Sequence, residues 1–117
     1  MDRFRPESFL PLTPVAFEIL LTLADGDRHG YSVMQEVGQR TGGAVTLHPG
    51  TLYRALARLL ETALIEELEA RPSEGDDERR RYYRLTARGR AVAEAEASRL
   101  ADQVAAARAR QLIKARP

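Results

Sequence analysis

The 117-residue sequence contains no cysteine and no tryptophan. Without cysteine, the chain can form neither disulfides nor thiolate metal sites, which is typical of a protein of the reducing cytoplasm. Without tryptophan, it lacks the broadest flat surface for stacking a planar ligand, although phenylalanine and tyrosine remain. No apolar stretch approaches the roughly 20 residues of a membrane-spanning helix. We therefore expect a cytoplasmic protein that has no membrane partner.

The usual signatures of catalytic and metal sites are also missing. The two histidines, His29 and His48, have no cysteine or carboxylate cluster beside them in the sequence. The glycines at Gly38, Gly42 and Gly43 lack the lysine and the spacing of a phosphate-binding loop. We expect a structural or capping role for His29, no metal or other cofactor, and no enzymatic activity.

Charge is segregated along the chain, although the formal net charge is only +1. Residues 61–78 carry eight acidic residues and one basic residue, whereas residues 79–90 carry six arginines and no acid. Because distribution matters more than the sum for binding a polyanion, the near-neutral total does not exclude nucleic acid as a partner.

Three segments have the hydrophobic spacing of amphipathic helices. The first is predicted at residues 14–24, because Thr13 can cap the free amides and Pro14 suits the first helical position. The second and third are predicted at residues 30–40 and 49–62. The apolar positions expected to form their packing faces are Val15, Ile19, Leu20, Leu23, Tyr31, Met34, Val37, Leu52, Leu56, Leu59 and Leu60.

Two short strands are predicted at residues 64–69 and 80–85, separated by a polar loop, and together they form a hairpin. Thr86 can then cap a last helix that extends from Ala87 towards Lys114. This order predicts a mostly helical α+β protein: a winged helix-turn-helix of three helices and a two-stranded wing, followed by a long helix. We divide it into an N-terminal extended arm (1–12), a winged helix-turn-helix domain (13–86) and a C-terminal dimerisation helix (87–117).

The third helix has the pattern of a DNA-reading helix. Thr51, Arg54 and Arg58 are spaced i, i+3, i+7 and share a face opposite the leucines. In winged-helix proteins this helix enters the major groove, where arginine can bond guanine or clamp a phosphate. The alternative interpretation is a solvated face without a partner. In the wing, Arg79, Arg80 and Arg81 favour phosphate, or else pair with the acidic run across the hairpin.

Several segments, in order, resemble the PadR family of transcriptional regulators, in its smaller subfamily with a single C-terminal helix. They cover roughly residues 12–90, and the match of the last helix is one of character only. The matching segments are Leu12-Thr13-Pro14, His29-Gly30-Tyr31, Pro49-Gly50-Thr51-Leu52-Tyr53-Arg54-Ala55-Leu56, and Arg81-Tyr82-Tyr83-Arg84-Leu85-Thr86 followed by Gly89.

This resemblance implies a repressor that dimerises through its last helix and releases DNA in response to a small molecule or stress signal. No effector can be named from the sequence. By position, the family's DNA contacts would fall on Tyr31, Thr51, Tyr53, Arg54, Arg58, Arg79, Arg80 and Arg81. Tyr31 and Tyr53 are equally compatible with a core or half-buried aromatic role.

The last helix has a pattern that indicates a partner. At about 28 residues and 1.5 Å per residue it would extend roughly 40 Å, which is more than this domain can cover. Spacings of four and three residues predict a helix-packing seam. Its members are Ala93, Ala97, Leu100, Val104 and Ala107. We expect a homodimer, with further apolar surface from the first helix and the arm, that binds an imperfect palindrome in double-stranded DNA.

Two other functions are compatible with the same fold. One is a winged-helix protein-interaction module that does not bind DNA and uses the acidic stretch of residues 66–78 as its contact surface. The other is a ligand-binding dimer that has lost its affinity for DNA.

Overall fold

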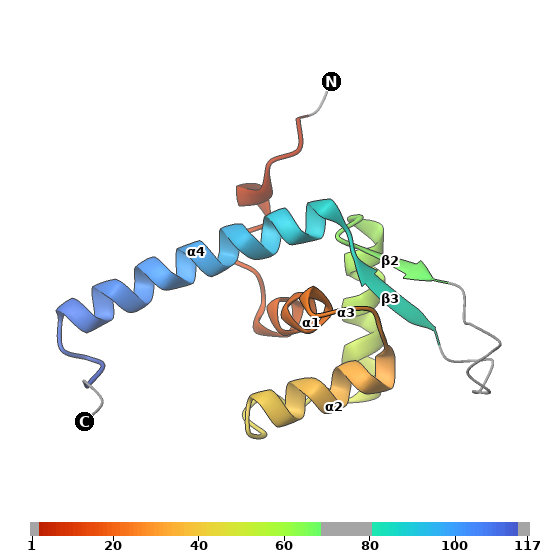
Figure 1. Cartoon of the computed structure of the whole chain (residues 1–117), viewed down its shortest axis with the longest axis horizontal. Helices are drawn as coiled ribbons and strands as arrows, with labels where there is room; N and C mark the ends of the chain where they lie inside the picture. The colour runs from red at the N-terminus through yellow and green to blue at the C-terminus, as the bar shows by residue number, and fades with distance from the viewer. Residues whose placement is uncertain (1–2, 69–80, 115–117) are drawn as a thin grey trace.

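The computed structural model of the chain describes residues 3–68 and 81–114. The predicted order of three helices, a hairpin and a long final helix is present, so the expected fold class is confirmed (Figure 1). The elements are η1 (Pro6–Phe9), α1 (Pro14–Ala24), β1 (Arg28–His29), α2 (Gly30–Arg40), α3 (Pro49–Glu61), β2 (Ile65–Leu68), β3 (Tyr82–Leu85) and α4 (Ala87–Ala109).

Side-chain caps define where three of the helices begin. The Oγ1 of Thr13 accepts the N–H of Ala16 at 3.1 Å, and the Oγ1 of Thr86 accepts the N–H of Gly89 at 3.0 Å. At the start of α2 the Nδ1 of His29 accepts the N–H of Ser32 at 3.1 Å. Each cap satisfies an amide that has no partner inside its own helix. The capping roles predicted for Thr13, Thr86 and His29 are confirmed.

The core lies where α1, α2 and α3 meet the sheet. Its fully buried side chains include Ile19 and Leu20 of α1 and Leu52 and Leu56 of α3, as the helical spacing predicts. The prediction for α2 was wrong in part: the buried residues of this helix are Gly30, Val33 and Val37, while Tyr31 is 55% exposed. Steps of three residues drift around a helix, so Tyr31 and Val37 end on different sides.

The sheet has three strands rather than the two predicted, in the order β1-β3-β2. Strand β3 pairs antiparallel with β2, with Glu67 opposite Tyr83 and Glu66 opposite Arg84. On its other edge β3 pairs with the two residues of β1. Residues 69–80, between β2 and β3, lie outside the described residues. The extra strand ties the start of α2 directly to the wing.

Helix α4 ends at Ala109, five residues before the predicted end. Gln111 adopts a left-handed φ of 62°, and the N–H groups of Gln111 and Leu112 donate back to the carbonyls of Arg108 and Ala107. This is a Schellman arrangement, which terminates a helix by satisfying its last carbonyls. Even so, the 23 residues of α4 extend about 35 Å, and its C-terminal half lies beyond the other elements (Figure 1).

The N-terminal segment packs on α4 and contains a short 3-10 helix, where an extended arm was predicted. The rings of Phe4 and Phe9 are 5.8 Å apart, and the guanidinium of Arg88 on α4 lies 4.8 Å from the Phe4 ring centre. Pro6 suits the first helical position of this turn, and the carbonyl of Arg5 accepts the hydroxyl of Ser8. No helix in the described part of the chain is both long and apolar enough to cross a membrane.

Candidate nucleic-acid interface

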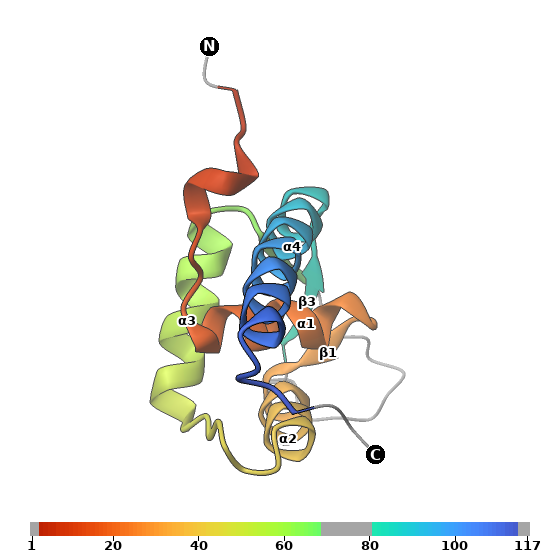
Figure 2. The same cartoon turned by 90° about the vertical axis from the view of Figure 1, so that its left-hand side faces the viewer.

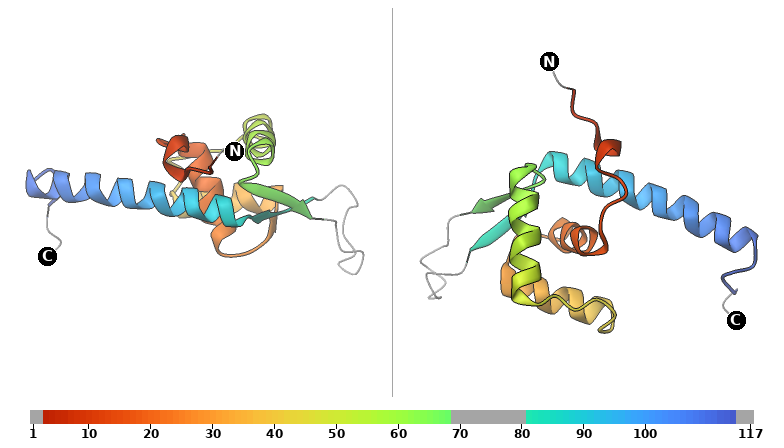
Figure 3. Two further views of the ribbon diagram at one scale, coloured as in Figure 1. Left: turned by 90° about the horizontal axis from the view of Figure 1, so that it is seen from above. Right: turned by 180° about the vertical axis from the view of Figure 1, so that it is seen from behind.

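Helix α3 forms one flank of the molecule, and its outer side is not covered by any described element (Figures 2 and 3). Its inner side is anchored by Leu52, Leu56 and Leu59, each at most 5% exposed. On the outer side Arg54 and Arg58 are exposed, and Thr51 is half-buried at the helix start. The helix therefore has one face that packs and one face that is available to a partner, as its sequence pattern predicts.

Arg54 and Arg58 have no carboxylate partner among residues 3–68 and 81–114. By contrast, Arg40 donates to Glu18 at 2.6 Å, and Arg84 donates to Asp27 at 3.1 Å. The outer face of α3 thus carries two uncompensated positive charges one helical turn apart. Two such guanidinium groups suit the edges of guanine or the oxygens of phosphate.

Two tyrosines flank this face and are more exposed than a core role would allow. Tyr31, at the start of α2, is 55% exposed, and Tyr53, on α3, is 54% exposed. The two helices approach closely here, since a Cβ placed on Gly30 would lie 3.3 Å from the hydroxyl oxygen of Tyr53. A glycine at position 30 therefore lets the Tyr53 hydroxyl sit against the start of α2.

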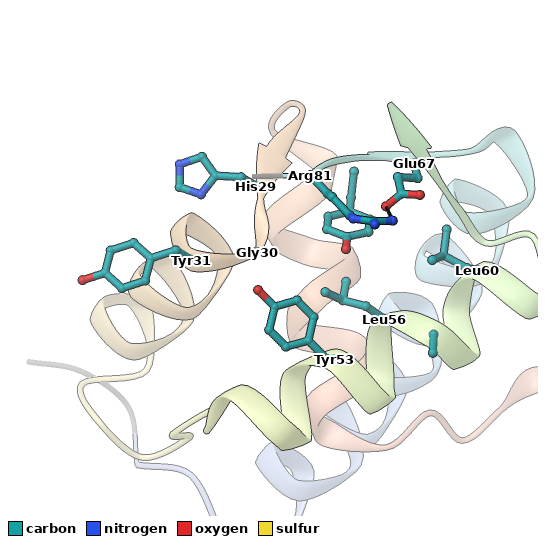
Figure 4. A pocket seen from close by; sticks show the side chains of 10 residues that line it. His29, Gly30, Tyr31, Tyr53, Leu56, Leu60, Glu67 and Arg81 are labelled. Atoms are coloured by element: carbon teal, nitrogen blue, oxygen red, sulfur yellow. Dashed lines mark hydrogen bonds and ion pairs between the residues drawn. The ribbon is translucent and has the colours of Figure 1, made fainter. Parts of the chain in front are cut away.

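A pocket of about 540 Å³ opens between α3 and the wing (Figure 4). Its walls are formed by the start of α2, by residues of β2 and β3, and by one side of α3. Its lining residues are His29, Gly30, Tyr31, Tyr53, Leu56, Ala57, Leu60, Glu67, Arg81 and Tyr83. Burial raises the pKa of the Tyr83 phenol above its usual value, and the carboxylate of Glu67 raises it further.

Of the three wing arginines predicted to bind phosphate, Arg81 is described, whereas Arg79 and Arg80 lie outside the described residues. The Nη1 of Arg81 donates to Oε1 of Glu67 at 3.0 Å, while the Arg81 side chain stays 69% exposed. This hydrogen bond and the Glu67 charge raise the pKa of the Arg81 guanidinium. The alternative weighed for the wing, pairing with the acidic strand, therefore holds for Arg81 in the unbound chain.

The opposite face of the wing carries a second ion pair that joins it to the turn after α1. Arg84 donates to both carboxylate oxygens of Asp27, at 3.4 and 3.1 Å, and lies 3.7 Å from Glu66. Asp27 is the main cause of the raised pKa of Arg84. Most of the acidic stretch considered as a protein-binding surface, residues 66–78, lies outside the described residues. The carboxylates of Glu66 and Glu67 lie against arginines, which leaves less free acidic charge for such a role.

The seam residues predicted on α4 fall into two groups. Ala93 packs against the chain's own core. Ala97 and Val104 are exposed, Val104 by 42%, while Leu100 and Ala107 are half-buried. The apolar residues that follow the helix, Leu112 and Ile113, are 74% and 39% exposed. Apolar surface thus remains uncovered on the projecting half of α4.

Two acidic residues with definite structural roles were not singled out from the sequence. Glu67 was counted only as part of the acidic run, yet alternation along β2 places it on the same face as the pocket. Glu96 was given no role from the sequence, yet it is 1% exposed. It follows Gly89 and Val92 at helical spacing, and that spacing was the signal that could have identified it.

Comparison with known proteins supports this description. The model of the transcriptional regulator PadR-like family matches residues 19–95. Protein X of Lysinibacillus sphaericus, an uncharacterized protein, is 36% identical over 73 residues, which are 62% of this chain. The chain spans 65% of the length of that relative and 22% of a second uncharacterized one, from Streptomyces fradiae.

Solved structures are similar over most of the chain. A PadR family transcription regulator from Clostridium difficile R20291 superposes with a TM-score of 0.67 at 29% identity, covering 79% of this chain and 94% of its own. RosR of H. salinarum superposes with a TM-score of 0.63 at 26% identity, covering 83% and 78%. The winged-helix architecture is shared with both.

Proposed function

The chain belongs to the PadR-like family of transcriptional regulators, and from this premise we propose that it regulates transcription by binding double-stranded DNA at specific sequences. The observation that carries the proposal is the outer face of α3, where Arg54 and Arg58 are exposed and have no carboxylate partner in the described part of the chain. A charged face without a counter-charge, on the helix that winged-helix proteins place in the major groove, suits a polyanionic partner.

The spacing of the two arginines fits base reading. Residues four apart in a helix are separated by about 6 Å along its axis, while each base-pair step of DNA rises about 3.4 Å. Arg54 and Arg58 would therefore reach different positions along the groove, each able to bond the O6 and N7 of a guanine. Thr51 at the helix start, with Tyr31 and Tyr53 beside it, would hold the backbone on either side.

The wing supplies the second contact in this proposal. Arg79, Arg80 and Arg81 follow one another in the sequence just before β3, in the part of a winged-helix protein that meets the backbone of the neighbouring groove. Contacts of this kind give affinity without reading sequence, so they position α3 rather than choose the site.

We further propose that two chains act together through α4. The exposed Val104 and the half-buried Leu100 leave apolar surface on the part of α4 that projects beyond the domain, and the exposed Leu112 adds to it just after the helix. The radius of gyration, 16.1 Å, exceeds the roughly 13 Å of a compact chain of this length. In this scheme residues 13–86 form the DNA-binding domain, residues 87–117 the dimerisation helix and residues 1–12 an arm packed against it. The operator is then an imperfect palindrome.

The family resemblance favours repression that a small molecule or stress signal relieves, and we propose this as the regulatory mode. Nothing in the proposal requires a catalytic step.

The test is a selection from random-sequence duplexes with the full chain, followed by fluorescence anisotropy on the enriched sequence over a salt series. We expect enrichment of a two-fold symmetric motif and an affinity that falls steeply with salt. Absence of both enrichment and binding at about 50 mM salt, where phosphate contacts are strongest, would overturn the proposal.

A further inference from the structure

The ion pair between Arg81 and Glu67 lies on the pocket side of the wing, facing α3. Figure 4 shows the guanidinium of Arg81 turned towards the carboxylate of Glu67, above Leu56 of α3, with Tyr53 on the same side. Glu67 and Tyr83 are opposite each other in the β2–β3 register, and all three residues line the pocket. Tyr31 and Tyr53, two of the predicted DNA contacts, line the same pocket, so under the proposed function the pair lies beside the DNA-facing surface.

This pair is held loosely enough to exchange. One hydrogen bond, 3.0 Å long, joins the two side chains, and the side chain of Arg81 is 69% exposed while that of Glu67 is 35% exposed. An exposed pair of this kind changes an equilibrium constant by at most about fivefold. A phosphate offers the guanidinium the same charge and the same bidentate geometry that a carboxylate offers. Phosphate and Glu67 are thus alternative partners for one cation.

We propose that Glu67 is a built-in competitor for the DNA backbone: it holds Arg81 in the free protein, and a DNA phosphate takes this guanidinium only by displacing the carboxylate. The inference rests on the proposed DNA binding, and it adds a residue that lowers the affinity for DNA. Displacement leaves Glu67 without its partner next to a phosphate, so part of the gain from the new contact is lost. Glu67 therefore lowers the affinity of the wing for any duplex, whatever its sequence.

The structure supplies a matched control on the same strand. Glu66 neighbours Glu67 in sequence, but alternation along β2 turns it to the opposite face, where it lies 3.7 Å from Arg84. Arg84 is also bonded to Asp27, so we expect it to stay in place when Glu66 is neutralised. Glu66→Gln and Glu67→Gln therefore remove the same charge from neighbouring positions, and only Glu67→Gln releases Arg81.

The experiment measures duplex binding by the full-length wild type and both variants, on the selected duplex and on an unrelated one, over a salt series. We expect Glu67→Gln to tighten binding to both duplexes by about three- to fivefold, and Glu66→Gln by less than about twofold. In Glu67→Gln, the contact of Arg81 with a phosphate releases a counterion from the DNA and leaves no carboxylate unpaired. The slope of log affinity against log salt should therefore be steeper than that of the wild type by about 0.9. Thermal unfolding checks that all three proteins are folded.

A second readout follows the guanidinium itself. The side-chain ¹⁵N–¹H signal of Arg81 should move when duplex is added to the wild type, because its partner changes. If the wild type binds duplex but Glu67→Gln behaves like Glu66→Gln, or the Arg81 signal does not move, the inference is overturned while the proposed function stands. If the wild type binds no duplex at all, the proposed function fails and the inference fails with it.

Discussion

The carboxylate of Glu96, in the middle of α4, accepts the backbone N–H of Leu12 at 2.8 Å. The same carboxylate is bonded by Arg99 one turn later, with the Nη2 of Arg99 donating to Oε2 at 3.2 Å. Glu96 is 1% exposed, so its charge is removed from water and depends on these donors. One side chain thus joins the segment that precedes α1 to the helix that follows the wing, 84 residues later.

Replacing Glu96 by alanine should destabilise the fold. The substitution leaves the Leu12 N–H without an acceptor, removes the partner of Arg99 and opens a small cavity, which together cost about 2–3 kcal/mol. Glu94→Ala, at an exposed position on the same helix, is the control and should change stability by less than about 0.5 kcal/mol. Urea unfolding of both variants measures the difference. Equal midpoints would show that Glu96 does not hold the two segments together.

The same contact predicts a pH dependence. The bonds from Arg99, and secondly from Leu12, hold the pKa of Glu96 below its ordinary value of 4.5. A carboxyl whose folded pKa is depressed stabilises the fold above its unfolded pKa, and loses this contribution as pH falls through the folded pKa. The difference in unfolding free energy between the wild type and Glu96→Gln should therefore be constant near neutrality and shrink below about pH 4.5. A difference that stays constant down to about pH 3 would contradict this account.

Replacing each of two glycines by alanine should change the stability of the fold in opposite directions. A Cβ on Gly89, in the first turn of α4, would lie 1.9 Å from the carbonyl oxygen of Leu64 and 2.8 Å from Cδ1 of Leu85. Because a backbone atom cannot move aside, Gly89→Ala should cost about 2–4 kcal/mol. A Cβ on Gly38, inside α2, meets nothing within 4 Å, so Gly38→Ala should stabilise by about 0.5–1 kcal/mol. Thermal unfolding of the pair tests this, and two shifts of the same sign would contradict the packing described.

The sequence predicted those features whose causes are local. The start of α1 follows from Thr13 and Pro14, and the start of α4 from the Thr86 cap, because each cap bonds an amide three residues away. The exposed outer face of α3 follows from its periodicity alone.

Features that depend on distant partners were missed. Strand β1 is two residues long, and only its pairing with β3, more than fifty residues later, makes it a strand. Glu96 reads as a surface residue in a charged helix until its bond to Leu12 is known. The early end of α4 depends on the left-handed conformation of Gln111, which a sequence rich in helix formers does not reveal.

Replacing Arg54 or Arg58 by alanine should separate base reading from phosphate binding. Loss of a bidentate contact to guanine should weaken the selected duplex about tenfold to a hundredfold and relax preference at one base pair. Loss of a phosphate contact should instead weaken all duplexes alike and reduce the salt slope by about 1. Arg108→Ala removes the same charge from the far end of α4 and is the control. If both α3 variants bind duplex as tightly as the control variant does, α3 is not part of the DNA interface.

Introducing a charge on the projecting half of α4 should test the proposed dimer. Val104 is 42% exposed in the single chain, and in a helix seam it would be buried, so Val104→Asp would place an unpaired carboxylate in apolar surroundings. We expect the variant to dissociate at concentrations where the wild type is dimeric, measured by light scattering coupled to size-exclusion chromatography. Gln103→Asp adds the same charge at the adjacent exposed position, off the predicted seam, and should leave the mass unchanged.

Because a palindromic operator needs two chains, Val104→Asp should also weaken binding to the full site far more than to a half-site. A wild type that is monomeric at every concentration, or a Val104→Asp protein that remains dimeric, would show that α4 does not form the interface through this seam.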